Sequence, residues 1–294
     1  MSDTTHHPSI GLFGLGRAGT SLYLSCRQRQ VSVPVLGTRC ASRRNLFCRE
    51  HSPTNSPVAT FDGFLEETSQ HQCDYMILAV PDDALDAYFK DLSNRDRPAS
   101  TLCHLSGARG AASFSGQKGS MTVSSFHPLA SLRGNGPIPE ETLVGIQAND
   151  PSTFNQLEFL ATRLGLTPAQ ILPNKNTNYH LAATMTANLS IALLEDAIEL
   201  MVEAGIEPAL AQKSLGHLLE SVFNELGSGK SLGELLTGPI ARGDLKTVRS
   251  HVEALDSSER QKQIYQLLSL RLLEMTGDKN DGHTEIKRLL TEEK

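Results

Sequence analysis

The feature that most constrains the fold is a glycine-rich turn close to the start of this 294-residue chain. Residues 10–19 read Ile-Gly-Leu-Phe-Gly-Leu-Gly-Arg-Ala-Gly, an apolar strand that leads through Gly14-x-Gly16-x-x-Gly19 into a helix. The first glycine allows a tight turn, the second lets a pyrophosphate approach the backbone, and the third lets the helix pack on the strand. The helix N-terminus offers unpaired N–H groups to the phosphates. The pattern predicts a dinucleotide site made by Gly14, Leu15, Gly16, Arg17, Ala18 and Gly19.

Apolar runs follow this turn at the spacing of alternating strands and helices. We predict strands at residues 31–36, 74–80, 101–105, 121–126, 143–147 and 169–172, with a helix at 154–164. The run at 74–80 is the continuous kind that a parallel strand needs when helices cover both faces. The sequence therefore predicts an α/β fold, in which a doubly wound parallel Rossmann sheet comes first.

The pattern changes near Pro173, after which only helical signals remain. Helices are expected at 178–204, 208–226, 244–255 and 258–276, the last with a capping box at Ser258. The first of them is apolar almost all round in its first half, so it is buried inside its domain or against a partner subunit. We expect a Rossmann NADP-binding domain at 1–173, a helical substrate and dimerisation domain at 174–277, and a charged C-terminal tail at 278–294. A homodimer through the helical domain follows from this reading.

Composition argues against several classes of function. The net charge of −6 and the pI near 5.9 argue against a nucleic acid partner. No uninterrupted apolar stretch of about 18 residues and no apolar N-terminal signal occurs, so we expect a cytoplasmic protein without a membrane partner. The five cysteines form no C-x-x-C pair, which indicates reduced thiols. Metal-binding, P-loop and hydrolase motifs are absent, so no metal site is predicted.

The residues after the second predicted strand distinguish between the two nicotinamide dinucleotides. A chain that binds NAD usually carries an acid about 20 residues past the glycine turn. Here no Asp or Glu occurs between Asp3 and Glu50. Thr38, Arg39 and Arg43 stand where the 2′-phosphate of NADP would lie, and one charge-assisted hydrogen bond contributes roughly 1.5–3 kcal/mol. We therefore predict NADP(H) as cofactor; the alternative is a basic surface helix without a ligand.

Ligands of open α/β sheets bind beyond the carboxyl ends of the strands, and this rule selects further residues. Ala79, Val80 and Pro81 end one strand, where they either flank the ribose and pyrophosphate or pack the strand end. Ser106 and Gly107 end the next strand and either approach the nicotinamide or form only a turn. All five are predicted cofactor-binding residues.

The candidate catalytic residues begin with His127, which also follows a strand. Histidine gives up a proton near neutral pH, and hydride transfer to C=O or C=N needs one, so we predict His127 as the proton donor. A structural histidine is the alternative. His104 lies inside a strand and is predicted to be a satisfied core residue.

A second polar group stands at the entry to the long helix. Lys175, Tyr179 and His180 precede Asn188, which lies eight residues after the histidine and so faces roughly the same way. We predict that His180 and Asn188 orient a carbonyl or imine. Helix-end hydrogen bonding and an interhelical amide contact explain them equally well.

The third group is the loop Leu236-Thr-Gly-Pro-Ile-Ala-Arg-Gly-Asp244. Its glycines and proline fix its shape, and Asp244 can cap the helix behind it. Arg242, next to a polar helix face formed by Asp244, Thr247 and His251, is predicted to bind the acidic group of a small substrate between the two domains. A buried structural network or a subunit contact is the alternative.

Together these motifs resemble the bacterial proteins that join a Rossmann-like NADP-binding domain to a C-terminal domain of unknown function, of the 2520 type. More distantly the chain is similar to pyrroline-5-carboxylate reductase, ketopantoate reductase and the deazaflavin-linked NADP reductases. The matching stretches are 14–19, 74–83, 104–107, 127–128, 179–180 with 188, and 236–244. The resemblance implies a two-domain, oxidoreductase-like NADP-binding protein whose helical domain dimerises. One departure is Asn176, which occupies the place of a basic residue three before the tyrosine.

These observations predict an NADP(H)-dependent oxidoreductase that transfers hydride to or from a small carbonyl or imine. The alternative is a catalytically inactive NADP(H)-binding sensor or assembly subunit. A methyltransferase is less consistent with the sequence, because such proteins usually carry an acid after the second strand.

Overall fold

A computed structural model describes residues 7–94, 100–116, 119–226, 229–277 and 280–291. The chain divides into two compact units, residues 1–188 and 189–294. The predicted domain boundary at residue 173 lies earlier, because the helix that follows it begins in the first unit.

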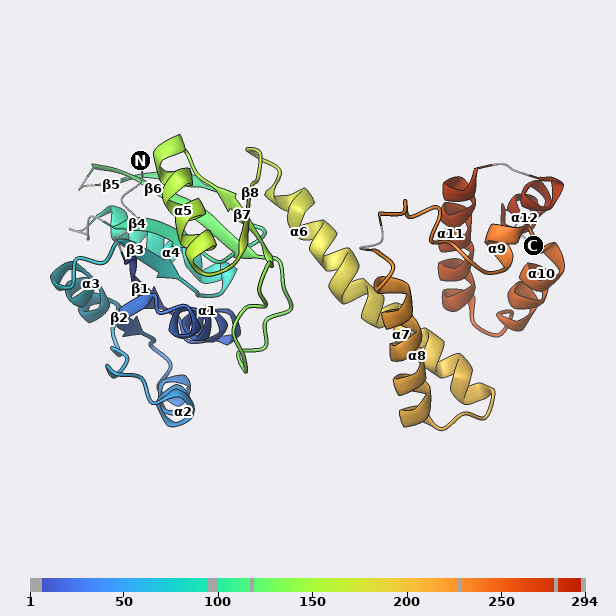
Figure 1. Ribbon diagram of the computed structural model, residues 1–294, viewed down its shortest axis with the longest axis horizontal. Coiled ribbons are helices and arrows are strands. Elements are labelled where there is room, and N and C mark those ends of the chain that lie inside the picture. Colours follow the sequence, from blue (N-terminus) through green and yellow to red (C-terminus); the bar gives the residue numbers. More distant parts are fainter. Residues whose placement is uncertain (1–6, 95–99, 117–118, 227–228, 278–279, 292–294) are drawn as a thin grey trace. The chain divides into compact units, whose positions relative to one another are not determined.

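The first unit is built on one sheet, which Figure 1 shows in blue to green. The strands are β1 (Ser9–Phe13), β2 (Ser32–Gly37), β3 (Tyr75–Leu78), β4 (Thr101–His104), β5 (Ala112–Gly116), β6 (Gly119–Pro128), β7 (Leu143–Gln147) and β8 (Thr167–Gln170). Their order is β2-β1-β3-β4-β6-β7-β8, and β5 pairs with β6. Every strand predicted from the sequence is therefore present in the structure.

The α/β class is confirmed, but the sheet is mixed where we predicted a fully parallel one. β6 pairs with β7 and with β5 in antiparallel orientation, whereas the pairs from β2 to β6 and from β7 to β8 are parallel. The reason is the connection after β6, which contains no helix. Parallel neighbours need a long crossover, whereas a simple loop returns the chain antiparallel.

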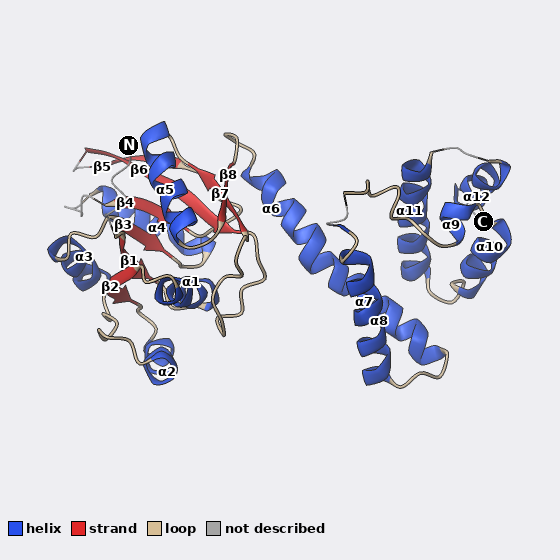
Figure 2. Ribbon diagram, viewed as in Figure 1, coloured by secondary structure: helices blue, strands red, loops and turns tan. Residues whose placement is uncertain are grey.

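Helices cover both faces of the sheet, as Figure 2 shows. The helices of this unit are α1 (Arg17–Gln28), α2 (Ala41–His51), α3 (Phe61–Gln70), α4 (Asp82–Ser93), α5 (Pro151–Arg163) and α6 (Asn176–Thr184), of which α1, α3, α4 and α5 cover the sheet. Alternate residues of β1 serve the two faces: Ile10 and Leu12 pack with α1 and α5, and Phe13 packs with α3 and α4. This alternation produces the doubly wound arrangement.

The long predicted helix is present and continuous from Asn176 to Glu203. It consists of α6, a π-helical turn η1 (Met185–Leu189) and α7 (Ser190–Glu203). By length and composition alone it is apolar enough to cross a membrane. An 18-residue stretch within it has a mean hydropathy of 1.2, and only 6% of that stretch is buried. Burial inside its own domain, one of the two alternatives, is therefore not what the structure shows.

The second unit is helical, as predicted. Its elements after α7 are α8 (Pro208–Phe223), α9 (Pro239–Arg242), α10 (Leu245–Ala254), α11 (Glu259–Thr276) and α12 (Asp281–Thr291). The region expected to be a charged, solvated tail with a short terminal helix contains the helix α12, but this helix is not solvated all round, because its Ile286 and Leu290 are buried in a core with α10 and α11. The expected capping box at Ser258 does not form, and Gln261 donates to Glu199 of α7 over 3.0 Å.

Candidate functional site

The three glycines of the turn have three different surroundings. Gly14 has a φ of +108°, and a Cβ there would collide with the Ala79 carbonyl. A Cβ at Gly19 would collide with the Gly14 carbonyl, so α1 packs against the turn itself. A Cβ at Gly16 would meet nothing within 4 Å. These are the roles of turn, close packing and open cradle that a dinucleotide turn requires.

The first turn of α1 provides a second part of this cradle. Its N-cap is Gly16, no side chain caps it, and no acid lies in the first turn. The unpaired N–H groups of a helix start carry partial positive charge, so an anion is the complementary ligand. The predicted cofactor residues 14–19 therefore fit a pyrophosphate on the evidence of the open space at Gly16.

The end of β2 carries the residues predicted to select NADP. Thr38 is buried, and its Oγ1 accepts the Cys40 N–H at 3.4 Å. The guanidinium of Arg39 stands 4.8 Å from the ring centre of Tyr88, so a flat cationic surface lies at the strand end. Arg43 lines a cavity of 380 Å³ beside Arg17 of α1.

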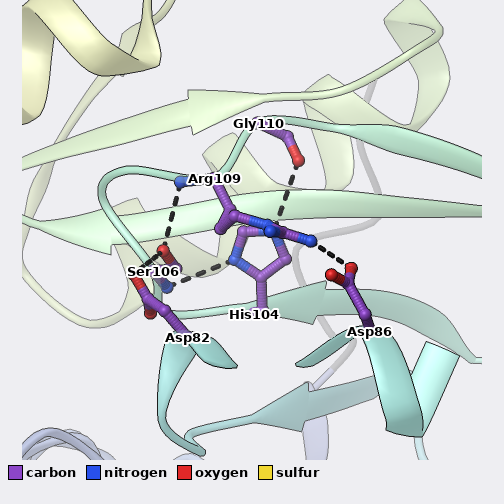
Figure 3. Close-up of polar contacts among 6 residues, drawn as sticks. All are labelled: Asp82, Asp86, His104, Ser106, Arg109 and Gly110. Carbon is purple, nitrogen blue, oxygen red and sulfur yellow. Dashed lines mark hydrogen bonds and ion pairs between the residues drawn. The ribbon is translucent and has the colours of Figure 1, made fainter. Parts of the chain in front are cut away.

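The turn after β4 is held by its own polar contacts (Figure 3). Ser106 Oγ donates to Asp82 over 2.7 Å and accepts the Arg109 N–H at 3.1 Å, while Arg109 pairs with Asp86. The Ser106 N–H donates to Nδ1 of His104 over 3.2 Å, which leaves the ring proton on Nε2 for the Gly110 carbonyl. Ser106 thus fixes the turn, and the carboxylate of Asp82 is engaged there and does not cap α4.

His104 is the satisfied core residue that the sequence predicts. It is fully buried, and this burial lowers the pKa of its imidazole to about 4. Both ring nitrogens have partners, so the side chain is neutral and structural.

A second cavity, of 460 Å³, gathers three predicted catalytic elements in the first unit. It is lined by His127, Leu129, Ala130, Ser131, Tyr179, His180, Ala182, Ala183, Thr184, Thr186, Ala187 and Asn188. The structure therefore brings together His127 from β6, His180 from α6 and Asn188 from η1. The cavity is mostly apolar with a few polar groups, as small-molecule sites are.

Glycines make the close approach of these rings possible. A Cβ at Gly107 would come within 2.8 Å of His127 Nε2 and 2.9 Å of His180 Cδ2. A Cβ at Gly145, the β7 partner of His127, would come within 2.7 Å of the Tyr179 ring. Gly107, predicted as a cofactor residue, thus leaves the space into which both imidazoles face.

Tyr179 holds His127 by its inner nitrogen. The phenol oxygen lies 3.1 Å from Nδ1, and the hydroxyl also lies 3.1 Å from the His127 carbonyl oxygen. Burial raises the pKa of Tyr179 to about 12, so the phenol stays protonated. The sequence places Tyr179 in the second polar group but indicates no role for it, because its contact with β6 is a tertiary one.

Burial also determines the charge state of His127. The pKa of His127 is lowered to about 4. Desolvation is the main cause, the neighbouring His180 adds to the shift, and Asp82 opposes it. Near neutral pH the ring is therefore a neutral imidazole. Its one proton is on Nδ1, because the Tyr179 hydroxyl donates to the His127 carbonyl and therefore accepts from Nδ1, so Nε2 is a hydrogen-bond acceptor.

The π-helical turn aligns His180 with Asn188. Eight residues of α-helix turn through about 800°, which leaves an offset of about 80°. A π-turn has more residues per turn, so each residue rotates less and the offset shrinks. Both side chains accordingly line the same cavity.

The residues at the start of α6 explain the departure from the family pattern. Lys175 is the exposed N-cap residue, whereas Asn176 is buried and donates from Nδ2 to the Arg109 carbonyl over 3.1 Å. Asn176 thus ties α6 to the turn after β4 through a buried, uncharged amide, whereas a lysine at this position would bring a charged group.

The remaining predicted residues belong to the second unit. Asp244 caps α10, with one carboxylate oxygen 3.1 Å from the Thr247 N–H and the other 2.7 Å from the Thr247 hydroxyl. These hydrogen bonds lower the pKa of Asp244. Arg242 is exposed at the end of α9. The predicted cap is confirmed, and substrate binding by this loop stays a prediction.

Comparison with known proteins identifies the second half of the chain. Residues 142–272 match the family model of the domain of unknown function DUF2520. None of the curated proteins matches the sequence.

Solved structures share the fold over nearly the whole chain. A Bacteroides fragilis protein described as a "putative NADP oxidoreductase" has a TM-score of 0.69 at 16% identity, covering 91% of this chain and 98% of its own. Protein TM1727 of Thermotoga maritima has a TM-score of 0.66 at 19% identity, with the same coverage. Pyrroline carboxylate reductase of Plasmodium falciparum, solved with NADP bound, has a TM-score of 0.56 at 11% identity, covering 92% and 98%. Residues 142–272 thus match the DUF2520 model, and the chain shares the fold of these solved structures.

Proposed function

We propose that this protein is an NADP(H)-dependent oxidoreductase acting on a small carbonyl or imine compound. The observation that carries the proposal is the pairing of two features at one edge of the sheet. The open glycine cradle follows β1, and the cavity of His127 and His180 lies beyond the ends of β4 and β6. Ligands of open α/β sheets bind at that edge.

The residues that would hold the cofactor follow from the geometry. The N–H groups of Arg17 and Ala18 would face the pyrophosphate, and Arg39 and Arg43 would supply cations for a 2′-phosphate. No acid competes for the ribose in this part of the sequence. When bound, the nicotinamide supplies or accepts the hydride.

The chain's own side chains orient the substrate and exchange protons with it. Because His127 is neutral and its one ring proton is on Nδ1, its Nε2 is a hydrogen-bond acceptor that can take the proton of a hydroxyl or amine group when hydride leaves the substrate. This replaces the imidazolium donor that the sequence suggested. Its ring lies 6.2 Å from that of His180, which is exposed to solvent and so can exchange protons with water. We assign proton delivery to His180 and orientation of the polar group to Asn188.

The test is the oxidation of NADPH across a panel of keto acids and cyclic imines, followed by nicotinamide absorbance. The proposal expects turnover of at least one compound, with loss of turnover in His180→Ala and a smaller decrease in Thr186→Ala, which lines the cavity and whose hydroxyl donates to the Ala182 carbonyl of the same helix. Tight NADPH binding without turnover of any compound would favour the sensor or assembly subunit instead.

We also propose that the protein is a homodimer whose subunits pair through the long helix. Leu181, Met185, Leu189, Ile191 and Leu193 are each between 46% and 66% exposed. An apolar surface of this extent marks an interface. Asp196 of the same helix forms an ion pair with Arg260 of α11, which ties α7 to the other helices of its unit by a charged contact and favours a second copy over a lipid.

A further inference from the structure

The connection between β6 and β7, residues 129–142, lies along α1. We call this segment the strap. Near its end, the Ile138 N–H donates to Ser25 Oγ of α1 over 2.8 Å, and the Ile138 side chain is buried in the core. Glu140 forms an ion pair with Arg29 at 2.6 Å, just beyond the last turn of α1. These contacts fix the strap to the C-terminal half of the helix.

The strap also reaches the first turn of α1. Gly134 has a φ of +78°, which favours glycine, and a Cβ there would lie 3.1 Å from Cα of Arg17 and 3.6 Å from Cβ of Thr20. The backbone of the strap therefore closes on the residues next to the glycine cradle. Contacts at both ends of α1 hold the strap in one position.

Arg133 is carried by the strap to this point. Together with Arg17 and Arg43 it lines the 380 Å³ cavity beside the cradle. Within the part of the chain that the structure describes, none of these arginines takes part in an ion pair, although Glu50 also lines the cavity. Three guanidinium groups around one cavity at a helix start are complementary to a multiply charged anion.

We propose that Arg133 binds the pyrophosphate of the dinucleotide from the side opposite the α1 amides. This inference rests on the proposed function. The pyrophosphate is favoured over the 2′-phosphate because the strap closes on Arg17, the first residue of α1, whereas Arg39 and Arg43 follow β2. No sequence pattern indicates that Arg133 binds a phosphate, because only the tertiary path of the strap brings it to the cradle.

The strap also lines both cavities. Leu129, Ala130 and Ser131 line the cavity of His127, and Arg133, Gly134 and Asn135 line the cavity beside the cradle. A phosphate held by Arg133 thereby fixes one wall of the substrate cavity. The cofactor's phosphates and the substrate's surroundings are thus coupled through seven consecutive residues, 129–135.

The test is calorimetric titration of the full chain with NADPH, NADH and ADP. Arg133→Ala should weaken all three by a similar factor, about tenfold to a hundredfold for one charge-assisted contact. Arg43→Ala should weaken NADPH far more than NADH. The matched control is Arg44→Ala. Arg44 follows Arg43 in the sequence but does not line the cavity, so this variant should leave all three affinities unchanged.

The outcomes separate the inference from the function on which it rests. Wild-type affinities in Arg133→Ala, with NADPH still bound by the wild type, overturn the inference alone. A loss confined to NADPH also overturns it, because it moves the guanidinium to the 2′-phosphate. A wild type that binds no dinucleotide overturns the proposed function as well. Arg133 is exposed, and thermal melting checks that the variant is folded.

Discussion

At the scale of single residues, burial decides the charge of two histidines. His104 and His127 both have pKa values lowered to about 4, chiefly by desolvation. His104 uses both nitrogens within the fold, whereas His127 keeps Nε2 facing the space left by Gly107. The same physical shift thus yields one structural residue and one candidate hydrogen-bond acceptor.

The first residue-scale prediction concerns stability against pH. Both histidines bind protons more tightly in the unfolded chain, whose value is 6.5, than in the folded protein. The contribution of each is therefore fully present above pH 6.5 and is lost as pH falls toward 4, on the order of 3 kcal/mol per histidine. Urea unfolding at pH 7.0, 5.5 and 4.5 measures it. His127→Asn should flatten the slope, and exposed His71→Asn should not; equal slopes in all three proteins would contradict the assignment.

The second residue-scale prediction concerns Tyr179. Tyr179→Phe removes the hydroxyl that holds His127 by Nδ1, so kcat/KM should fall by about tenfold, as for one lost buried hydrogen bond. Tyr75→Phe is the control, since its hydroxyl also donates to a backbone carbonyl, that of Gln156, but lies away from the cavity. Equal kinetic effects in the two variants would argue for a general structural role.

At the scale of elements, the glycine turn separates stability from binding. A methyl group at Gly19 would meet the Gly14 carbonyl, so Gly19→Ala should lower the free energy of unfolding by about 1–3 kcal/mol or more. A methyl group at Gly16 meets open space at a φ of −76°, so Gly16→Ala should melt like the wild type yet bind NADPH at least about tenfold more weakly. Unchanged NADPH affinity in Gly16→Ala would contradict the cradle.

The elements that the sequence predicts are those whose signal is local. The continuous apolar run of β3 and the apolar face of α5 identify themselves. β5, Ala112–Gly116, has no such signal, since four of its five residues are small and only Phe114 is a large apolar residue. Its strand conformation depends on pairing with β6. The antiparallel direction of β7 and the π-turn in the long helix are likewise set by tertiary packing.

The same distinction applies to the candidate site. Gly14, Gly16 and Gly19 are recognisable because their spacing is itself the geometry. His127 and His180 were identifiable as strand-end and helix-entry residues, although the loss of charge on His127 required its burial to be known. Arg133 was not identifiable, because no local pattern shows that residues 129–142 run along α1.

At the scale of the whole molecule, the main feature to explain is the apolar face of the long helix, which is exposed to solvent in the single chain. Light scattering at micromolar concentration should give twice the mass of one chain. Leu189→Glu should yield a monomer, while Leu267→Glu, at a leucine on α11 that is still more exposed, should leave the dimer intact. A monomeric wild type would contradict the dimer, and co-flotation with lipid vesicles would instead favour the membrane reading of this helix.

The most direct test of the central claim is titration of the wild-type protein with NADPH and NADH under identical salt conditions. The glycine cradle, the absence of an acid after β2 and the arginines at positions 39 and 43 predict that NADPH binds about tenfold to a hundredfold more tightly. Equal affinity for the two dinucleotides, or no binding of NADPH, would contradict the account.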